Sequence, residues 1–301
     1  MQFWPLKNQA SALQIDTGVR MSHRVISFRQ WVPLGKALTT ALLCLLCWTG
    51  WSIPALAQSS LSELSSQTVQ EISDLRQKAF TASQKGQFTE AETYWSELIE
   101  YLPDEAAVWS NRGNVRVSQN KLTEALEDYN QAVALAPEQP DPYLNRGAAL
   151  EGLGRWEDAI ADYTQVLALN PDDAAAYNNR GNAQAGLGHW ETALADYQTA
   201  ADLDPKFAFA RVNAALAEYQ LGHADEAIRQ FRNLTRRYPS FADARAALTA
   251  ALWGQGMSGE AESNWVAVVG LDGRYKDLDW VSTVRRWPPA MVAALEKFLN
   301  L

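Results

Sequence analysis

Small and aromatic side chains recur among polar ones in a pattern that returns every 34 residues along most of the chain. In each period an alanine is followed four residues later by an aromatic residue, as at Ala125 and Tyr129. Positions i and i+4 lie on one face of a helix, so this pair predicts a helix with one small and one large buried side chain. A proline such as Pro137 follows and is expected to end that helix.

The prolines set the register of the repeat. They are Pro103, Pro137, Pro171, Pro205 and Pro239. With each proline at position 32, six repeats are expected over residues 72–105, 106–139, 140–173, 174–207, 208–241 and 242–275. Position 20 is always alanine: Ala91, Ala125, Ala159, Ala193, Ala227 and Ala261. Position 24 is always aromatic: Trp95, Tyr129, Tyr163, Tyr197, Phe231 and Trp265. The sixth repeat departs from the pattern, with Gly273 in place of proline.

A turn is expected near the middle of each repeat, at position 15. The residues there are glycines and one asparagine, which adopt a left-handed conformation at the lowest cost: Gly86, Asn120, Gly154, Gly188, Gly222 and Gly256. Position 8 is Gly113, Gly147 or Gly181 in the second to fourth repeats. A residue without a side chain is expected where two helix backbones approach closely, so each repeat is predicted to be a pair of antiparallel helices.

These features resemble the tetratricopeptide repeat, a helix-turn-helix unit of 34 residues. The segments Asn111–Gly113, Asn145–Gly147 and Asn179–Gly181 resemble its common bacterial form. The resemblance implies an all-α, right-handed superhelical solenoid of about six repeats over residues 72–275. Residues 276–301 are expected to form a C-terminal cap, because a solenoid needs its last apolar face covered. A final helix with Met291, Leu295 and Phe298 on one face would do this.

The N-terminal segment has a different composition. Four basic residues precede an apolar run over residues 37–51, and Ala55-Leu56-Ala57 follows. This order predicts a Sec-type signal peptide over residues 1–57. The run has about 15 residues, fewer than the ~20 needed to span a bilayer. An uncleaved anchor is the alternative, and Met21 is an alternative start. Residues 58–71 are rich in Ser and Gln and are expected to form a flexible lead-in, with a short helix that starts at Leu61 and Leu64 as the alternative.

Composition excludes several classes of ligand. Both cysteines, Cys44 and Cys47, lie in the signal segment, so the exported chain has no thiol chemistry. Without residues 1–57 it has 21 Lys and Arg against 34 Asp and Glu, a net charge of −13. Such a surface repels nucleic acid and anionic headgroups, so we expect membrane contact only through a partner or an uncleaved anchor. Trp287-Pro288-Pro289 resembles the C-terminus of lumenal tetratricopeptide proteins of cyanobacteria and chloroplasts, which implies the thylakoid lumen or the periplasm.

No residue pattern predicts catalysis, a metal site or a cofactor. Gly254, Gly256 and Gly259 match Gly-x-Gly-x-x-Gly, but they fall on an inter-helix turn and no strand precedes them, as a dinucleotide site would require. His189 and His223 both occupy position 16 and are expected to be solvated turn residues. Without cysteines nearby they lack the partners of a metal site. We therefore expect no enzyme activity and no small-molecule substrate.

Arginine and aspartate occur together in the second to fourth repeats. Position 7 is Arg112, Arg146 or Arg180, and position 23 is Asp128, Asp162 or Asp196. The outer repeats lack the aspartate, and two of those three also lack a cation at position 7. This co-occurrence favours a structural ion pair between the two helices of a repeat over a contact with a ligand.

Asparagines are the candidate binding residues. Position 6 is Asn111, Asn145, Asn179 and Asn213 in four successive repeats. In the tetratricopeptide fold this position lines the concave face, so the resemblance implies a ladder of amides along a groove. Each amide offers a donor and an acceptor to the backbone of an extended peptide. Asn114 and Asn182 at position 9 would extend this polar floor. The alternative is that these asparagines are wettable groove residues that bond to neighbouring repeats.

Two hypotheses for the function follow. The first is a non-catalytic scaffold or assembly factor that binds an extended segment of a protein partner in the groove. Tails of cytosolic chaperones are not expected there, because position 5 has none of the lysines of the known clamp: Ser110, Leu144, Asn178 and Val212. The second is a self-associating structural module of the envelope or lumen. Its groove would be filled by its own N-terminal segment or by a sister copy.

Overall fold

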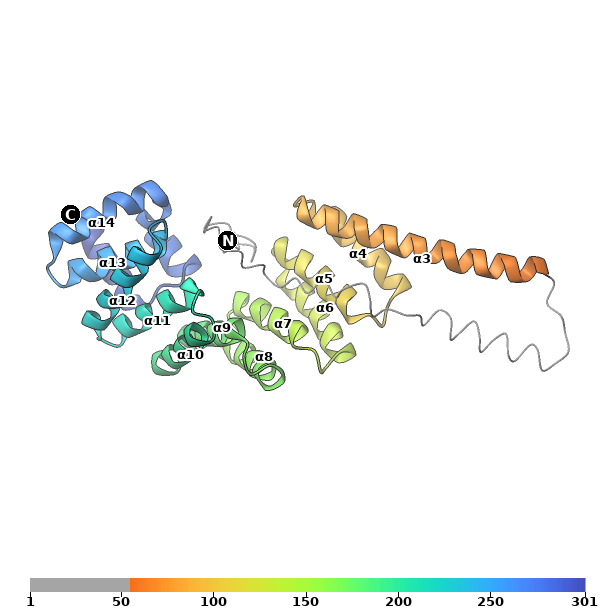
Figure 1. The fold of residues 1–301 in the computed structure, drawn as a ribbon, viewed down its shortest axis with the longest axis horizontal. Coiled ribbons are helices and arrows are strands. Elements are labelled where there is room, and N and C mark those ends of the chain that lie inside the picture. Colours follow the sequence, from red (N-terminus) through yellow and green to blue (C-terminus); the bar gives the residue numbers. More distant parts are fainter. Residues whose placement is uncertain (1–54, 301) are drawn as a thin grey trace. The chain divides into compact units, whose positions relative to one another are not determined.

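The computed structural model describes residues 55–300, and the side chains of residues 66–300. All regular elements in this range are helical, which confirms the expected all-α class (Figure 1). The described residues fall into two compact units, one ending at Tyr101 and one beginning at Leu102. None of the described helices is both long enough and apolar enough to cross a membrane. The expected signal peptide lies outside the described residues, apart from Ala55 to Ala57.

The first unit is a pair of helices, α3 (Ala55–Gln84) and α4 (Phe88–Tyr101). Ala79 and Ala91 are fully buried, and the ring of Phe80 packs edge-on against Trp95 with 5.0 Å between centroids. Residues 58–71 belong to α3, so the expected flexible lead-in is wrong in this structure. The segment contains no glycine or proline after Pro54, so nothing in its sequence interrupts the helix.

The second unit contains five helix pairs that follow one another along the chain. They are α5 (Ala106–Ser118) with α6 (Leu122–Leu135), α7 (Pro140–Gly152) with α8 (Trp156–Leu169), α9 (Ala174–Gly186) with α10 (Trp190–Leu203), α11 (Ala208–Gln220) with α12 (Ala224–Arg237), and α13 (Ala242–Gly254) with α14 (Ser258–Leu271). The first helix of each pair begins at the first residue of an expected repeat. The expected solenoid is thus the observed architecture.

The glycines at position 8 are required by the aromatic residue of the same repeat. A Cβ atom on Gly113 would lie 2.7 Å from the Cε1 atom of Tyr129, and one on Gly147 would lie 2.7 Å from that of Tyr163. Tyr129 and Tyr163 are at most 1% exposed. The ring lies directly on the helix backbone, which only glycine permits at this separation.

The turn at Gly154 shows how each pair reverses direction. Its φ of 71° is left-handed, and the N–H group of Arg155 donates to the carbonyl of Leu150 at 2.9 Å. This is the helix-ending arrangement for which glycine is preferred. Asn120 takes the same conformation in the second repeat, with a φ of 62°.

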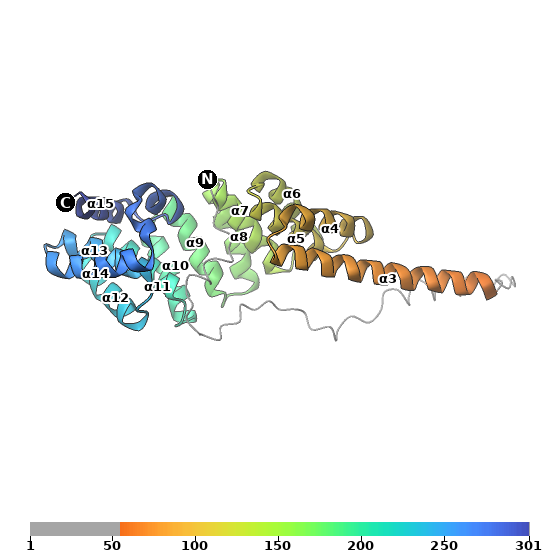
Figure 2. The same ribbon diagram turned by 90° about the horizontal axis from the view of Figure 1, so that it is seen from above.

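The C-terminal segment consists of a 3₁₀ turn η1 (Gly273–Lys276), a π turn η2 (Trp280–Val284) and α15 (Pro289–Leu299). As expected, Met291, Leu295 and Phe298 form the buried face of α15. This face packs on α13 and α11, the first helices of repeats six and five (Figure 2).

The segment covers the last repeat, as expected of a cap: Phe298 packs edge-on against Trp253 of α13 and Trp265 of α14, at 5.5 and 5.2 Å between centroids. Val269 on α14 occupies position 28, where Leu167, Ala201 and Thr235 are buried beneath the next repeat. Val269 is 38% exposed. The cover is partial, because Val269 stays accessible on α14.

Candidate peptide-binding site

The first helices of the repeats line the inner side of the second unit. Neighbouring first helices pack against one another, as α5 does with α7, α7 with α9 and α11 with α13. The second helices of neighbouring repeats are farther apart. Because the closer set must lie on the inside of a curved stack, the candidate asparagines on α5, α7, α9 and α11 belong to the inner side.

The position 6 asparagines differ in how their amides are used. Asn111 donates to the carbonyl of Ala107 at 2.7 Å, which leaves its carbonyl oxygen as an acceptor. Asn145 is partly exposed, and its amide makes no hydrogen bond with the residues that the structure describes. Asn179 accepts a bond from the Nδ2 atom of Asn178 at 3.3 Å. These three asparagines retain donors or acceptors for a ligand.

Asn213 is engaged within the protein instead. Its Nδ2 atom donates to the Oδ1 atom of Asn178 at 3.0 Å and to that of Asn182 at 3.3 Å. The amide therefore joins α11 to α9. The expected ladder of four becomes three available positions and one that links two repeats.

The position 9 asparagines have a structural partner that the sequence analysis did not foresee. The hydroxyl of Tyr129 donates to the Oδ1 atom of Asn114 at 2.7 Å, and that of Tyr197 donates to Asn182 at 3.0 Å. Burial raises the pKa of both tyrosines, so each hydroxyl keeps its proton and acts as a donor. The asparagines satisfy buried hydroxyls, and their Nδ2 groups are the atoms left for a ligand.

The expected arginine–aspartate pairs are present in all three central repeats. Arg146 donates from Nε and Nη2 to Asp162 at 2.8 and 2.6 Å, a bidentate contact. Arg180 and Asp196 form the same pair at 2.7 and 2.8 Å. Each aspartate lies on the second helix and each arginine on the first. The pairs therefore fix the two helices of a repeat against each other, as expected.

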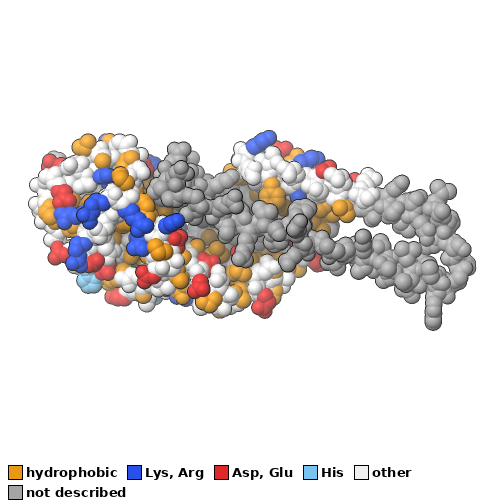
Figure 3. All heavy atoms as spheres, viewed as in Figure 1, with side chains coloured by type: hydrophobic (Ala, Val, Ile, Leu, Met, Phe, Trp, Pro, Cys, Tyr) orange, Lys and Arg blue, Asp and Glu red, His pale blue; other side chains and the backbone are white. Residues whose placement is uncertain are grey.

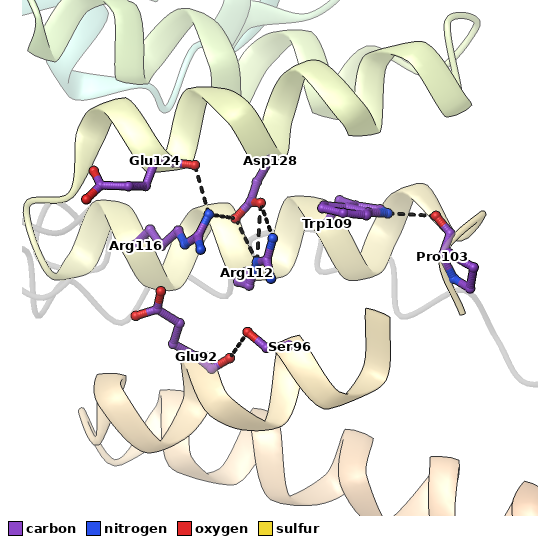
Figure 4. A network of polar contacts seen from close by, with 8 residues as sticks. All are labelled: Glu92, Ser96, Pro103, Trp109, Arg112, Arg116, Glu124 and Asp128. Carbon is purple, nitrogen blue, oxygen red and sulfur yellow. Dashed lines mark hydrogen bonds and ion pairs between the residues drawn. The ribbon is translucent and has the colours of Figure 1, made fainter. Parts of the chain in front are cut away.

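The pair in the second repeat has an additional cation. Arg112 binds Asp128 with bonds of 2.7 to 3.2 Å, and Arg116 donates to the same carboxylate at 3.0 Å (Figure 4). Asp128 is 1% exposed, so two guanidinium groups compensate one buried charge. The guanidinium of Arg112 also lies over the Trp109 ring, 5.0 Å from its centroid. Both oxygens of this carboxylate are therefore engaged within the repeat.

The C-terminal segment is anchored on the inner side by one buried carboxylate. Asp243 on α13 is 3% exposed and accepts hydrogen bonds from Tyr275 at 2.7 Å, Trp287 at 3.0 Å and Arg285 at 2.9 Å from Nε. Burial alone would lower the pKa of Arg285, but the charge and hydrogen bonds of Asp243 raise it overall. The guanidinium of Arg285 also lies 5.7 Å from the centroid of Phe209 on α11.

The same segment reaches as far as the third repeat. Arg286 donates from Nη1 to the Oε2 atom of Glu151 at 3.0 Å, across 135 residues of sequence. Its guanidinium lies 5.0 Å from the centroid of Trp156. Further along, the N–H group of Ala290 donates to Gln220 at 2.9 Å. The inner side of repeats three to six is therefore partly covered from within the chain, while α5 is not contacted by these residues.

Sequence reasoning missed this contact, although one signal was available. The third repeat has Ala148 at position 9, where Asn114 and Asn182 accept the tyrosine bond. Tyr163 donates instead to the Oε1 atom of Glu151 at 2.5 Å. Glu151 is the one acidic residue at position 12 of the six repeats, which marks it as unusual.

The remaining candidates are placed as follows. Gly256 forms the turn between α13 and α14, with a φ of 73°, so the glycine motif lies on an inter-helix turn as expected. His189 and His223 are both exposed turn residues, as expected, and the Nδ1 atom of His223 also lies 2.6 Å from Glu218. The described residues hold no cluster of His, Cys, Asp and Glu able to bind a metal ion.

Charge is unevenly distributed over the second unit. Residues 102–205 have 6 Lys and Arg against 17 Asp and Glu, whereas residues 206–300 have 12 against 10. Lys and Arg side chains accordingly gather over the part formed by α11 to α13 (Figure 3). The asparagines that retain binding capacity belong to the acidic part.

The paired helices, the buried glycine–tyrosine contacts and the inner face of first helices define a helical-repeat solenoid. Models of the family match residues 113–154 and 153–188 as "TPR repeat", and residues 174–207 and 212–269 as "Tetratricopeptide repeat". The chain is a tetratricopeptide repeat protein. Its fold is one that is typical of protein–protein interaction.

Solved structures agree with the fold. A tetratricopeptide repeat protein from Parabacteroides merdae is 21% identical, with a TM-score of 0.60 over 77% of this chain and 100% of that one. MamA from Desulfovibrio magneticus is 20% identical, with a TM-score of 0.52 over 55% and 93%. A protein of the same class from Thermus thermophilus is 21% identical, with a TM-score of 0.50 over 60% and 99%. No curated protein matches the sequence.

Proposed function

We propose that the protein is a non-catalytic scaffold or assembly factor that binds an extended segment of a protein partner on the inner face of repeats two to four. The observation that carries the proposal is the set of available amides at Asn111, Asn145 and Asn179 on neighbouring first helices. They occur in the part of the inner face where the C-terminal segment makes its fewest contacts.

The chemistry of these amides suits a peptide backbone. An asparagine side chain presents one acceptor and one donor group, which match the N–H and C=O groups of an extended chain. The Nδ2 groups of Asn114 and Asn182 add donors beside them, because only their oxygens are bonded to tyrosines. Because these bonds go to the backbone, many partner sequences would be tolerated. The affinity would then depend on an extended conformation of the partner in addition to its side chains.

The N-terminal segment supports a location outside the cytosol. The basic residues, the apolar run over residues 37–51 and the Ala-x-Ala site favour export by a Sec-type signal, with the thylakoid lumen or the periplasm as destination. The partner would then be a lumenal, periplasmic or membrane-complex subunit. Expression of the full chain in a bacterium followed by N-terminal sequencing of the exported product tests this. A new terminus at Gln58 is expected, and retention of residues 1–57 in a cytosolic product would contradict it.

A self-associating module is the second candidate, and the partly open face of α14 favours it. Val269, at the position that is buried beneath the next repeat elsewhere, is 38% exposed, and Val266 beside it on α14 is 75% exposed. Light scattering over a range of protein concentrations discriminates the two candidates. A scaffold for a different partner is expected to remain monomeric, whereas a self-associating module forms dimers or larger species without any addition.

Partner capture tests the scaffold directly. Residues 58–301 immobilised beside a variant with Asn111, Asn145 and Asn179 changed to Ala are exposed to the same extract. The wild-type chain is expected to retain a partner that the variant loses. Equal retention by both would show that the asparagines do not bind it.

A further inference from the structure

Glu151 and Trp156 bind a guanidinium group that comes from the far end of the chain, and Tyr163 donates a hydrogen bond to Glu151. The Glu151 side chain is 9% exposed, and its two oxygens have separate partners, Tyr163 at 2.5 Å and Arg286 at 3.0 Å. The Trp156 ring provides an aromatic face for the same cation. A buried carboxylate combined with an aromatic face is the arrangement that suits arginine better than lysine.

The repeat architecture does not require this site. Position 12 is Val117, Ala185, Tyr219 and Trp253 in the other repeats of the second unit. These repeats fold with the same helix pairing and have no carboxylate there. The site is also shaped by its neighbour, because a Cβ atom on Gly186 would lie 2.7 Å from the Trp156 ring. Tyr163 explains why the third repeat has an acceptor at position 12, since Ala148 offers none, but a hydroxyl does not require the second carboxylate oxygen that binds the cation.

The occupant is held less firmly than its neighbours. Arg286 has a left-handed φ of 55°, a conformation that non-glycine residues adopt at a cost. Its side chain is 40% exposed, whereas that of Arg285 is 20% exposed and both Trp287 and Asp243 are 3% exposed. The segment would stay anchored through Arg285 and Trp287 if Arg286 left its site. An exchange at Arg286 therefore does not require the C-terminal segment to detach.

We propose that Glu151, Trp156 and Tyr163 form a binding site for an arginine side chain of the partner, and that Arg286 occupies it as an intramolecular ligand until that arginine displaces it. The site rests on the proposed function, since it adjoins the face that carries Asn145 and Asn179. The acidic character of residues 102–205 favours approach of a cationic segment. An extended partner segment with an arginine at its end would then contact both the asparagines and Glu151.

The test uses the full chain with Arg286→Gly, which empties the site and suits the left-handed backbone at that position. The probe is N-acetyl-arginine amide, and binding is measured by ligand-observed NMR. We expect the variant to bind it at least tenfold more tightly than the wild type, because the internal competitor is gone. N-acetyl-lysine amide is expected to bind more weakly, and Arg286→Gly combined with Glu151→Gln to lose the gain.

Arg155→Ala is the matched control. Arg155 lies in the turn between α7 and α8, is exposed, and pairs with Asp158 instead of Glu151. It should leave probe binding at the wild-type level. Equal binding by the wild type and Arg286→Gly, with both folded by circular dichroism, would overturn the proposal. So would binding that persists without the Glu151 charge. The probe contains no partner, so failure here would not bear on the asparagines, whose test is partner capture.

Discussion

Replacing Asp162 by Ala should destabilise the protein because it leaves a partly buried cation unpaired. Asp162 is 5% exposed and accepts both of its bonds from Arg146, whose side chain is 22% exposed. Removing one member of a buried pair typically costs 3–5 kcal/mol. Arg146 keeps its bond of 2.9 Å to Asn130 and its contact with the Tyr143 ring. We therefore expect a loss near the lower end, about 3 kcal/mol.

Thermal and urea unfolding followed by circular dichroism measure this loss. For a unit of this size, about 3 kcal/mol corresponds to a fall in Tm of roughly 6–12 °C. Asp158→Ala is the matched control, since Asp158 lies one turn earlier on α8 and its pair with Arg155 is more than half exposed. Its effect should stay within about 0.5 kcal/mol. If Asp162→Ala were no more destabilising than this control, the structural role of the pairs would be refuted.

Four further changes test the packing and the buried carboxylate. Gly147→Ala should lower the free energy of unfolding, because the new Cβ atom would press on the Tyr163 ring. Gly270→Ala on α14 meets no atom within 4 Å and should raise the free energy of unfolding by about 0.5–1 kcal/mol. Urea unfolding measures both changes. Gly154→Ala should cost about 1 kcal/mol through its left-handed φ alone, as nothing lies near its Cβ position, and no measurable loss would contradict the turn assignment. Burial raises the pKa of Glu151, opposed by its bonds from Tyr163 and its partner arginine, so its ionised form costs stability as the pH rises above the ordinary value of 4.5. The free energy of unfolding of Glu151→Gln, relative to that of the wild type, should accordingly be higher at pH 7 than at pH 4. Urea unfolding at the two pH values measures this, and a difference that does not depend on pH would contradict the raised pKa.

The repeats could be predicted from sequence because their determinants are local and recur. Gly113 and Tyr129 are 16 residues apart in one unit, and the same spacing returns in the next two repeats, so one physical explanation is tested several times along the chain. The arginine–aspartate pairs could be predicted for the same reason. Arginine at position 7 and aspartate at position 23 occur in the same repeats, as Arg146 and Asp162 do, and their contact lies within one helix pair.

The position of the C-terminal segment could not be predicted in this way. Met291, Leu295 and Phe298 show that one face of α15 is buried, but amphipathicity does not say against which surface. The contact of Arg286 with Glu151 joins segments 135 residues apart and occurs once, so no repetition reveals it.

The roles of the asparagines were predicted only in part. Asn111, Asn145 and Asn179 have amides available on the inner face, whereas Asn213 spends its donor on α9 because Asn178 and Asn182 both occur there. The residues around an asparagine decide whether its amide bonds to a neighbouring repeat or stays available to a ligand. Those surroundings depend on the adjacent repeat and not on position 6 itself.

The central claim is that the inner face of repeats two to four binds its partner through asparagine amides. Its most direct test is the affinity of the captured partner for the chain with Asn111, Asn145 and Asn179 changed to Ala. The matched control changes three glutamines on the second helices of the same repeats, Gln131, Gln165 and Gln198. We predict that the asparagine variant binds at least tenfold more weakly and the glutamine variant within twofold of wild type. Equal affinity of the asparagine variant and the wild type would contradict the account.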